Sequence, residues 1–127
     1  MCAPANCCRG GPTLIFACSG AADVGEIADQ AARKLTRDGI GKMFCLAGVG
    51  GRVGGIIKTT ESAGKILAID GCPLNCVKNC LEQAGFNKFM HLQLADLGFE
   101  KGKSPGTEDN INKVSQKAVE MLKPNAG

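Results

Sequence analysis

Short apolar runs alternate along this chain with segments whose apolar residues recur at helical spacing. The runs have the length and composition of buried strands, and they occupy residues 13–17, 42–47, 65–70 and 89–94. Strands that alternate with helices predict right-handed crossover connections, and therefore a mostly parallel sheet with helices on both faces. We expect an α/β fold: a small three-layer domain with a mostly parallel four-stranded sheet in the order 2-1-3-4.

Residues typical of helix ends bound the helical segments. The expected helices occupy residues 23–38, 50–62 and 73–84, followed by a last helix between Thr107 and Pro124. Asp23 with Glu26 three residues later is typical of a helix start. Pro73 favours the first position of its helix, because its missing N–H group would have no partner there. This places Cys72 at the helix cap and Cys76 in the first turn.

Length and charge limit what such a domain does. With 127 residues, of which 44% are hydrophobic, the chain can bury one modest core. We expect residues 1–12 to form a tail rich in Cys, Pro and Gly, and residues 13–127 to form a single α/β domain. The net charge is only +3 and no dense basic block occurs, so we do not expect nucleic acid as the main partner. No apolar run approaches the length that spans a bilayer.

The chain contains eight cysteines, which in a small secreted protein would predict a disulfide framework. The apolar stretch near the start, residues 13–22, is better explained as a strand and turn than as the core of a signal peptide. We therefore expect a cytoplasmic, reducing setting. In such a setting, clustered cysteines indicate metal or thiol chemistry.

Four cysteines are expected at one edge of the sheet. Cys18 follows the first apolar run, Cys45 lies within the second, and Cys72 and Cys76 follow the third. Ligands of open α/β sheets bind outside the carboxyl ends of the strands where the order reverses, here between strands 1 and 3. Neighbouring strands lie about 4.8 Å apart, so these thiols could surround one ion. Zinc with four sulfurs at about 2.3 Å fits that arrangement, although no CxxC pair supports it.

The thiols also have a simpler explanation, because free cysteine is often buried as a small hydrophobic residue. This applies most to Cys45, which lies inside an apolar run. Cys80 lies one helical turn beyond Cys76, about 6 Å along the helix, and we expect it to be a bystander. The tail cysteines, Cys2, Cys7 and Cys8, precede strand 1 and so start from the opposite edge of the sheet.

The motifs around the four cysteines resemble those of the DGC domain family, whose members are described as zinc-binding proteins. The matching segments occur in the family's order: Cys18-Ser19-Gly20 with Asp23-Val24-Gly25, then Cys45-Leu46-Ala47-Gly48, then Ile69-Asp70-Gly71-Cys72-Pro73-Leu74-Asn75-Cys76. The similarity covers residues 13–103. It implies a zinc site made by four cysteines, which map onto Cys18, Cys45, Cys72 and Cys76, in a family without an assigned biochemical role.

Three other features have weaker implications. The glycine-rich segment 48–55 lies where a phosphate-binding loop would lie, and Arg52 could meet an anion there. It matches neither GxGxxG nor GxxxxGK[ST], and close packing explains it more simply. His91, the only histidine, is expected to be a sheet residue rather than a ligand. Asp70 either accepts N–H groups that order the following turn or supports a metal ligand.

Two classes of function follow, and they differ in whether a metal keeps an open position. Four thiolates that close a tetrahedron would make a zinc-binding module, with a small-molecule or protein partner left open. A free, nucleophilic Cys72 or Cys76 would instead make a thiol redox or sulfur-transfer enzyme. Four thiolates also hold iron–sulfur clusters, so an iron–sulfur carrier is a third hypothesis.

Overall fold

Four parallel strands form the sheet in the computed structural model, which describes residues 11–123. In spatial order they are β2 (Lys42–Met43), β1 (Thr13–Ala17), β3 (Lys65–Asp70) and β4 (Met90–Gln93). Ile15 of β1 lies between Met43 of β2 and Leu67 of β3. The predicted α/β class and the strand order 2-1-3-4 are both confirmed, and the order reverses between β1 and β3.

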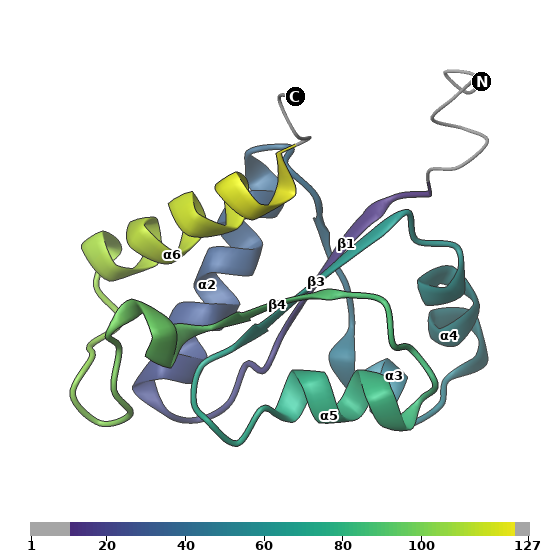
Figure 1. Cartoon of the computed structure of the whole chain (residues 1–127), viewed down its shortest axis with the longest axis horizontal. Coiled ribbons are helices and arrows are strands. Elements are labelled where there is room, and N and C mark those ends of the chain that lie inside the picture. Colours follow the sequence, from purple (N-terminus) through teal and green to yellow (C-terminus); the bar gives the residue numbers. More distant parts are fainter. Residues whose placement is uncertain (1–10, 124–127) are drawn as a thin grey trace.

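Helices cover both faces of the sheet, as Figure 1 shows. They are α2 (Asp23–Arg37), α3 (Leu46–Gly50), α4 (Gly54–Glu61), α5 (Cys76–Gln83) and α6 (Glu108–Leu122), with the short 3₁₀ helix η1 (Leu94–Leu97). Side chains alternate along the central strands, so Ile15 and Leu67 are buried under α2 and α6. Phe16 and Ala68 are buried on the opposite face, under α3, α4 and α5. The three-layer prediction is therefore confirmed.

The second strand is shorter than predicted, which changes the place of Cys45. β2 ends at Met43, whereas the sequence predicted a strand over residues 42–47. Phe44 still donates its N–H group to the carbonyl of Ile15 at 2.9 Å. Its ring then packs edge-on against Phe16, with ring centroids 6.1 Å apart. Cys45 has left the sheet and is the N-cap of α3.

The predicted helix over residues 50–62 corresponds to α4, Gly54–Glu61, which starts later than expected. α3 ends at Gly50 and α4 starts at Gly54. Arg52, between them, has a φ of 58°, in the left-handed region that interrupts a right-handed helix.

The third predicted helix begins later than expected. α5 starts at Cys76 rather than at Pro73, because Asn75 has a φ of 56° and breaks the helical geometry. Cys76 lies in the first turn, as predicted, but Cys72 is not the cap. Pro73 instead occupies the second position of a β-turn closed by the Asn75 N–H group and the Cys72 carbonyl at 3.2 Å, where its fixed φ is equally suitable.

The remaining boundaries lie close to the predictions. α2 covers all but the last residue of its predicted range, with Ala22 rather than Asp23 as N-cap. β4 occupies Met90–Gln93 within the predicted 89–94, and η1 follows it. Thr107 caps α6 as predicted, its Oγ1 accepting from the Asn110 N–H group at 3.3 Å.

The described chain enters the sheet at the edge opposite the cysteines. The Pro12 carbonyl accepts from the Gly64 N–H group at 2.9 Å, beside the start of β1. The tail cysteines, Cys2, Cys7 and Cys8, and the predicted helix end at Pro124 lie outside the described residues. The division of the chain at residue 12 stays a prediction. None of the helices between residues 11 and 123 combines the length and the apolar character needed to cross a bilayer.

Candidate functional site

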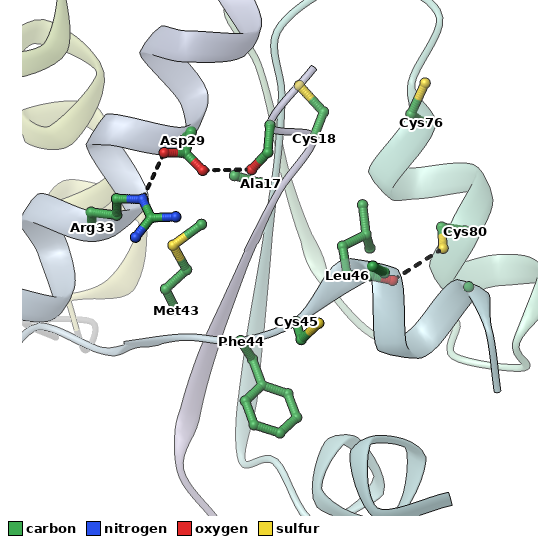
Figure 2. Close-up of a pocket in the computed structure, with 13 residues that line it drawn as sticks. Ala17, Cys18, Asp29, Arg33, Met43, Phe44, Cys45, Leu46, Cys76 and Cys80 are labelled. Atoms are coloured by element: carbon green, nitrogen blue, oxygen red, sulfur yellow. Dashed lines mark hydrogen bonds and ion pairs between the residues drawn. The ribbon is translucent and has the colours of Figure 1, made fainter. Parts of the chain in front are cut away.

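Two neighbouring pockets at the carboxyl edge of the sheet are lined by cysteines. Cys18, Cys45, Cys76 and Cys80 line the larger pocket, of about 800 Å³. Figure 2 shows Cys18 at the end of β1, Cys45 at the start of α3, and Cys76 and Cys80 on α5. Cys18, Cys72 and Cys76 line the smaller pocket, of about 470 Å³. All five are free thiols. The four predicted site residues therefore share the expected edge, and Cys18 and Cys76 line both pockets.

Cys18 continues the line of β1 at the switch point of the sheet. Its N–H group donates to the carbonyl of Ile69 at 3.2 Å, so its backbone is fixed by β3. The next residue, Ser19, has a φ of 51°, which turns the chain away from the sheet. Backbone strain of this kind often occurs at functional sites.

A short polar chain holds Ser19 in that conformation. Its hydroxyl donates to Asp29 Oδ1 at 2.7 Å, and Arg33 Nε donates to Asp29 Oδ2 at 2.7 Å. Figure 2 shows Asp29 and Arg33 on the α2 side of the larger pocket. Partial burial acts to raise the pKa of Asp29, but the hydrogen bonds from Arg33 and Ser19 and the charge of Arg33 lower it overall.

Cys45 is exposed at the start of α3. Its sulfur accepts from the Gly48 N–H group at 3.3 Å, as a capping side chain does. The glycines that follow allow α3 to approach its neighbours closely: a Cβ on Gly48 would lie 2.7 Å from Ile56, and one on Gly50 would lie 3.3 Å from the Cys80 sulfur. This supports the packing explanation of the glycine-rich segment.

The Arg52 side chain makes structural hydrogen bonds to three backbone carbonyls. Its guanidinium donates to the carbonyls of Val49 at 2.8 Å, Gly50 at 3.3 Å and Gln83 at 3.0 Å. These carbonyls lie at the C-terminal ends of α3 and α5, which have acceptors without helical partners. Arg52 therefore joins the two helices that carry Cys45 and Cys80.

Asp70 provides the cap that α5 otherwise lacks. Asn75, the N-cap residue, makes no side-chain capping bond. Instead the Asp70 carboxylate, 1% exposed, accepts from the N–H groups of Val77 at 2.8 Å and Lys78 at 3.1 Å. Of the two roles considered for Asp70, the structure shows the ordering of the turn. Two N–H groups in the first turn of α5 are consequently already bonded and are not free to stabilise a Cys76 thiolate.

His91 lies in β4, as predicted, and has a structural partner. Its Nε2 lies 2.8 Å from Asp70 Oδ2. Asp70 thus contacts two N–H groups and one imidazole nitrogen around the start of α5.

Gln93 is a site residue that the sequence reasoning missed. Its Nε2 donates to the Cys72 carbonyl at 2.9 Å and also to Asn75 Oδ1. His91 and Gln93 are polar residues at alternate positions of one strand, so they share a face. The fold covers both faces of the sheet, so two polar side chains on one face of a strand are unusual. This pattern was the signal in the sequence that could have identified Gln93.

Cys80 is part of the pocket wall, whereas its place on the helix suggested a position away from the site. It lies half-buried in the larger pocket, with its sulfur 3.9 Å from the Leu46 carbonyl. Burial raises the pKa of Cys80, the charge of Arg52 opposes this effect, and Cys76 adds to it. Cys80 therefore lines the same pocket as three of the predicted ligands.

The donor chemistry of the edge suits a thiophilic metal, but the ligands are not assembled. Within residues 11–123, no three Cys, His, Asp or Glu side chains lie close enough together to hold one ion. Cys45 and Cys76 are both exposed, so their side chains can rotate without disturbing the core. A four-thiolate site thus requires movement of side chains at the edge.

An α/β fold with cysteines at the carboxyl edge of its sheet defines the class of this protein. The DGC domain matches residues 14–118, most of the chain, and the chain belongs to this family. It is also similar to the anaerobic and virulence modulator AnvM of Pseudomonas aeruginosa, with 42% identity over 88 residues, covering 69% of this chain and 67% of AnvM. No solved structure matches the chain.

Proposed function

We propose that this DGC domain protein binds one zinc ion through the thiolates of Cys18, Cys45, Cys72 and Cys76, in a reducing, cytoplasmic setting. The observation that carries the proposal is that two cysteine-lined pockets adjoin at the switch point and share Cys18 and Cys76. Cys45 lines one pocket and Cys72 the other, so a rotation of exposed side chains toward Cys18 would complete a set of four.

Hydrogen bonds from neighbouring residues fix the backbone next to the proposed ligands. Asp29 and Ser19 fix the turn after Cys18, and Asp70 fixes the start of α5. When bound, zinc would keep the thiols deprotonated and cross-link the end of β1 and the start of α3 to the turn after β3.

Metal analysis of anaerobically purified protein tests the proposal. We expect about one zinc per chain, and sharply less in each serine variant of the four ligands, because a hydroxyl is a poor substitute for a thiolate. Cys80→Ser is the matched control and should retain the metal. Loss of zinc in Cys80→Ser, with full occupancy in Cys72→Ser, would replace Cys72 by Cys80 in the ligand set.

A thiol redox or sulfur-transfer function is the second candidate. It is supported by the exposure of Cys76 at the first position of α5, where a reagent could reach it. The name of AnvM, anaerobic and virulence modulator, adds a regulatory role to this proposal. In that role the thiol edge would respond to redox conditions.

Alkylation of the metal-loaded protein separates the two functions. A closed four-thiolate site protects Cys72 and Cys76 until zinc is removed. Rapid labelling of either thiol with zinc still bound would favour the thiol enzyme. A coloured protein that contains iron and labile sulfide would favour the iron–sulfur carrier instead.

A further inference from the structure

We propose that Gln93 is a positioning residue that sets the orientation of Cys72 relative to Cys76. The proposal rests on the proposed function only because it takes Cys72 and Cys76 to be functional thiols. Gln93 lies at the end of β4, and its side-chain amide spans the gap to the turn that joins β3 to α5. It is the one side chain in the described structure that bonds both to Cys72 and to the residue before Cys76.

The contacts of Gln93 fix which way its amide points. Nε2 donates to the Cys72 carbonyl at 2.9 Å and to Asn75 Oδ1, while Oε1 accepts from the Ala95 N–H group at 3.2 Å. A flipped amide would place its oxygen against two oxygens and its NH₂ group against an N–H group. All three bonds would be lost, so the amide has one satisfactory orientation.

Asn75 is the residue on which this contact acts. Its φ of 56° lies in the left-handed region, which residues other than glycine adopt rarely. Asparagine is among the residues that tolerate this region best. The Asn75 backbone N–H group closes the turn onto Cys72, and its side chain accepts from Gln93. Gln93 therefore holds both ends of the turn, and with them the directions in which Cys72 and Cys76 leave the backbone.

The neighbouring polar residues, Asp70 and His91, stabilise the start of α5 rather than the turn before it. Asp70, with His91 behind it, bonds the N–H groups of Val77 and Lys78, which belong to the body of α5. Loss of that contact would loosen the helix start as a whole. Loss of the Gln93 amide would leave the helix capped and free the turn before it.

The test measures alkylation rates of individual cysteines in metal-free, reduced protein, mapped by mass spectrometry. Gln93→Leu removes the amide, and Gln93→Glu replaces its donor by an acceptor that faces two oxygens. We expect the ratio of the Cys72 and Cys76 rates to change by about fivefold in each, the factor that the net loss of one hydrogen bond produces. The Cys45 rate should stay at its wild-type value. Gln116→Glu, on the exposed side of α6, is the matched control.

A second substitution distinguishes positioning from general loosening. Glycine adopts the left-handed conformation without strain, so Asn75→Gly in the Gln93→Leu background should bring the rate ratio back toward the wild type. An unchanged ratio in both Gln93 variants would overturn the proposal, and so would an equal rise in the rates of Cys45, Cys72 and Cys76. Failure of the rescue would show that Gln93 does not act through Asn75. None of these readouts requires zinc, so a failed zinc proposal leaves this test intact.

Discussion

Asp70 and His91 are in contact next to the turn that runs from Cys72 to Asn75, here called the cysteine turn. The Asp70 carboxylate lies 2.8 Å from the His91 ring nitrogen Nε2. Asp70 ends β3 and His91 lies on the neighbouring strand β4, which pairs with β3 in parallel. The contact therefore joins the sheet to the start of α5, because the same carboxylate also accepts from two N–H groups of that helix.

The Asp70→Asn variant should lose stability because its amide NH₂ group cannot accept the hydrogen bonds that one carboxylate oxygen accepts now. We expect the free energy of unfolding to fall by about 1–3 kcal/mol, the range for a buried group left without its partner. Urea unfolding measures this change. Asp96→Asn, at an exposed position, is the control, and an equal loss in both variants would contradict a special role for Asp70.

Gly71 and Gly55 should respond to alanine with opposite signs. A Cβ on Gly71 would lie 2.6 Å from the Val24 carbonyl oxygen, whereas one on Gly55 meets nothing within 4 Å. Gly71→Ala should therefore destabilise the protein by about 1–3 kcal/mol. Gly55→Ala, in α4, should stabilise it by about 0.5–1 kcal/mol, because alanine favours helix. Denaturant midpoints of the two variants measured side by side check this prediction.

The Arg52→Ala variant should lose the hydrogen bonds that join α3 to α5. The guanidinium bonds three carbonyls at the ends of these helices, so we expect a loss of about 1–2 kcal/mol in unfolding free energy. The Arg52 charge also acts to lower the pKa of Cys80, so its removal should raise that pKa. A pH titration of the Cys80 alkylation rate detects this shift, with Arg37→Ala as the control. An unchanged titration would show that the charge does not reach the thiol.

Acid should weaken the contact between α2 and the loop at residues 100–104. The Gly102 N–H group holds the pKa of Asp23 below its ordinary value of 3.8, with Ser104 and Val24 adding to this effect against partial desolvation. A carboxyl whose pKa is lower in the folded state contributes stability above pH 3.8, and this contribution is lost as the pH falls through the folded-state pKa. Asp23→Asn should remove that part of the pH dependence from unfolding curves recorded at decreasing pH. A variant with the full wild-type slope would contradict the assignment.

Chelation should lower the melting temperature without abolishing the fold. Metal that binds only the native state adds to its stability, but the core consists of apolar side chains buried on both faces of the sheet. Far-ultraviolet circular dichroism with and without chelator should show the same helical signal at low temperature. Complete unfolding on chelation would show that the metal contributes more of the stability than the core suggests.

The arrangement of layers was predictable because it depends on periodic burial along the sequence. The alternation of strands and helices predicted a parallel sheet with helices on both faces, and the shared edge of the cysteines followed from the strand ends. The conformation of the cysteine turn was not predictable in this way. Pro73 suits both a helix start and a β-turn, and the left-handed Asn75 decides between them with Gln93, eighteen residues away, as its partner.

The position of Cys45 was also not predictable from the sequence pattern. An apolar run predicted a strand through residue 47, but β2 lies at the edge of the sheet and pairs only with β1. The sulfur could therefore leave the strand and cap α3. The sequence predicted which edge holds the thiols, whereas their relative directions depend on contacts between residues far apart in the chain.

Cys18 and Cys76 belong to the walls of both pockets, and this limits how the two pockets can be used. A bulky group attached to either sulfur would narrow both spaces at once. Two separate molecules, one in each pocket, would contend for the same two thiols. Occupants of this edge would therefore compete, so that a single covalent event at Cys18 or Cys76 changes access to the whole site.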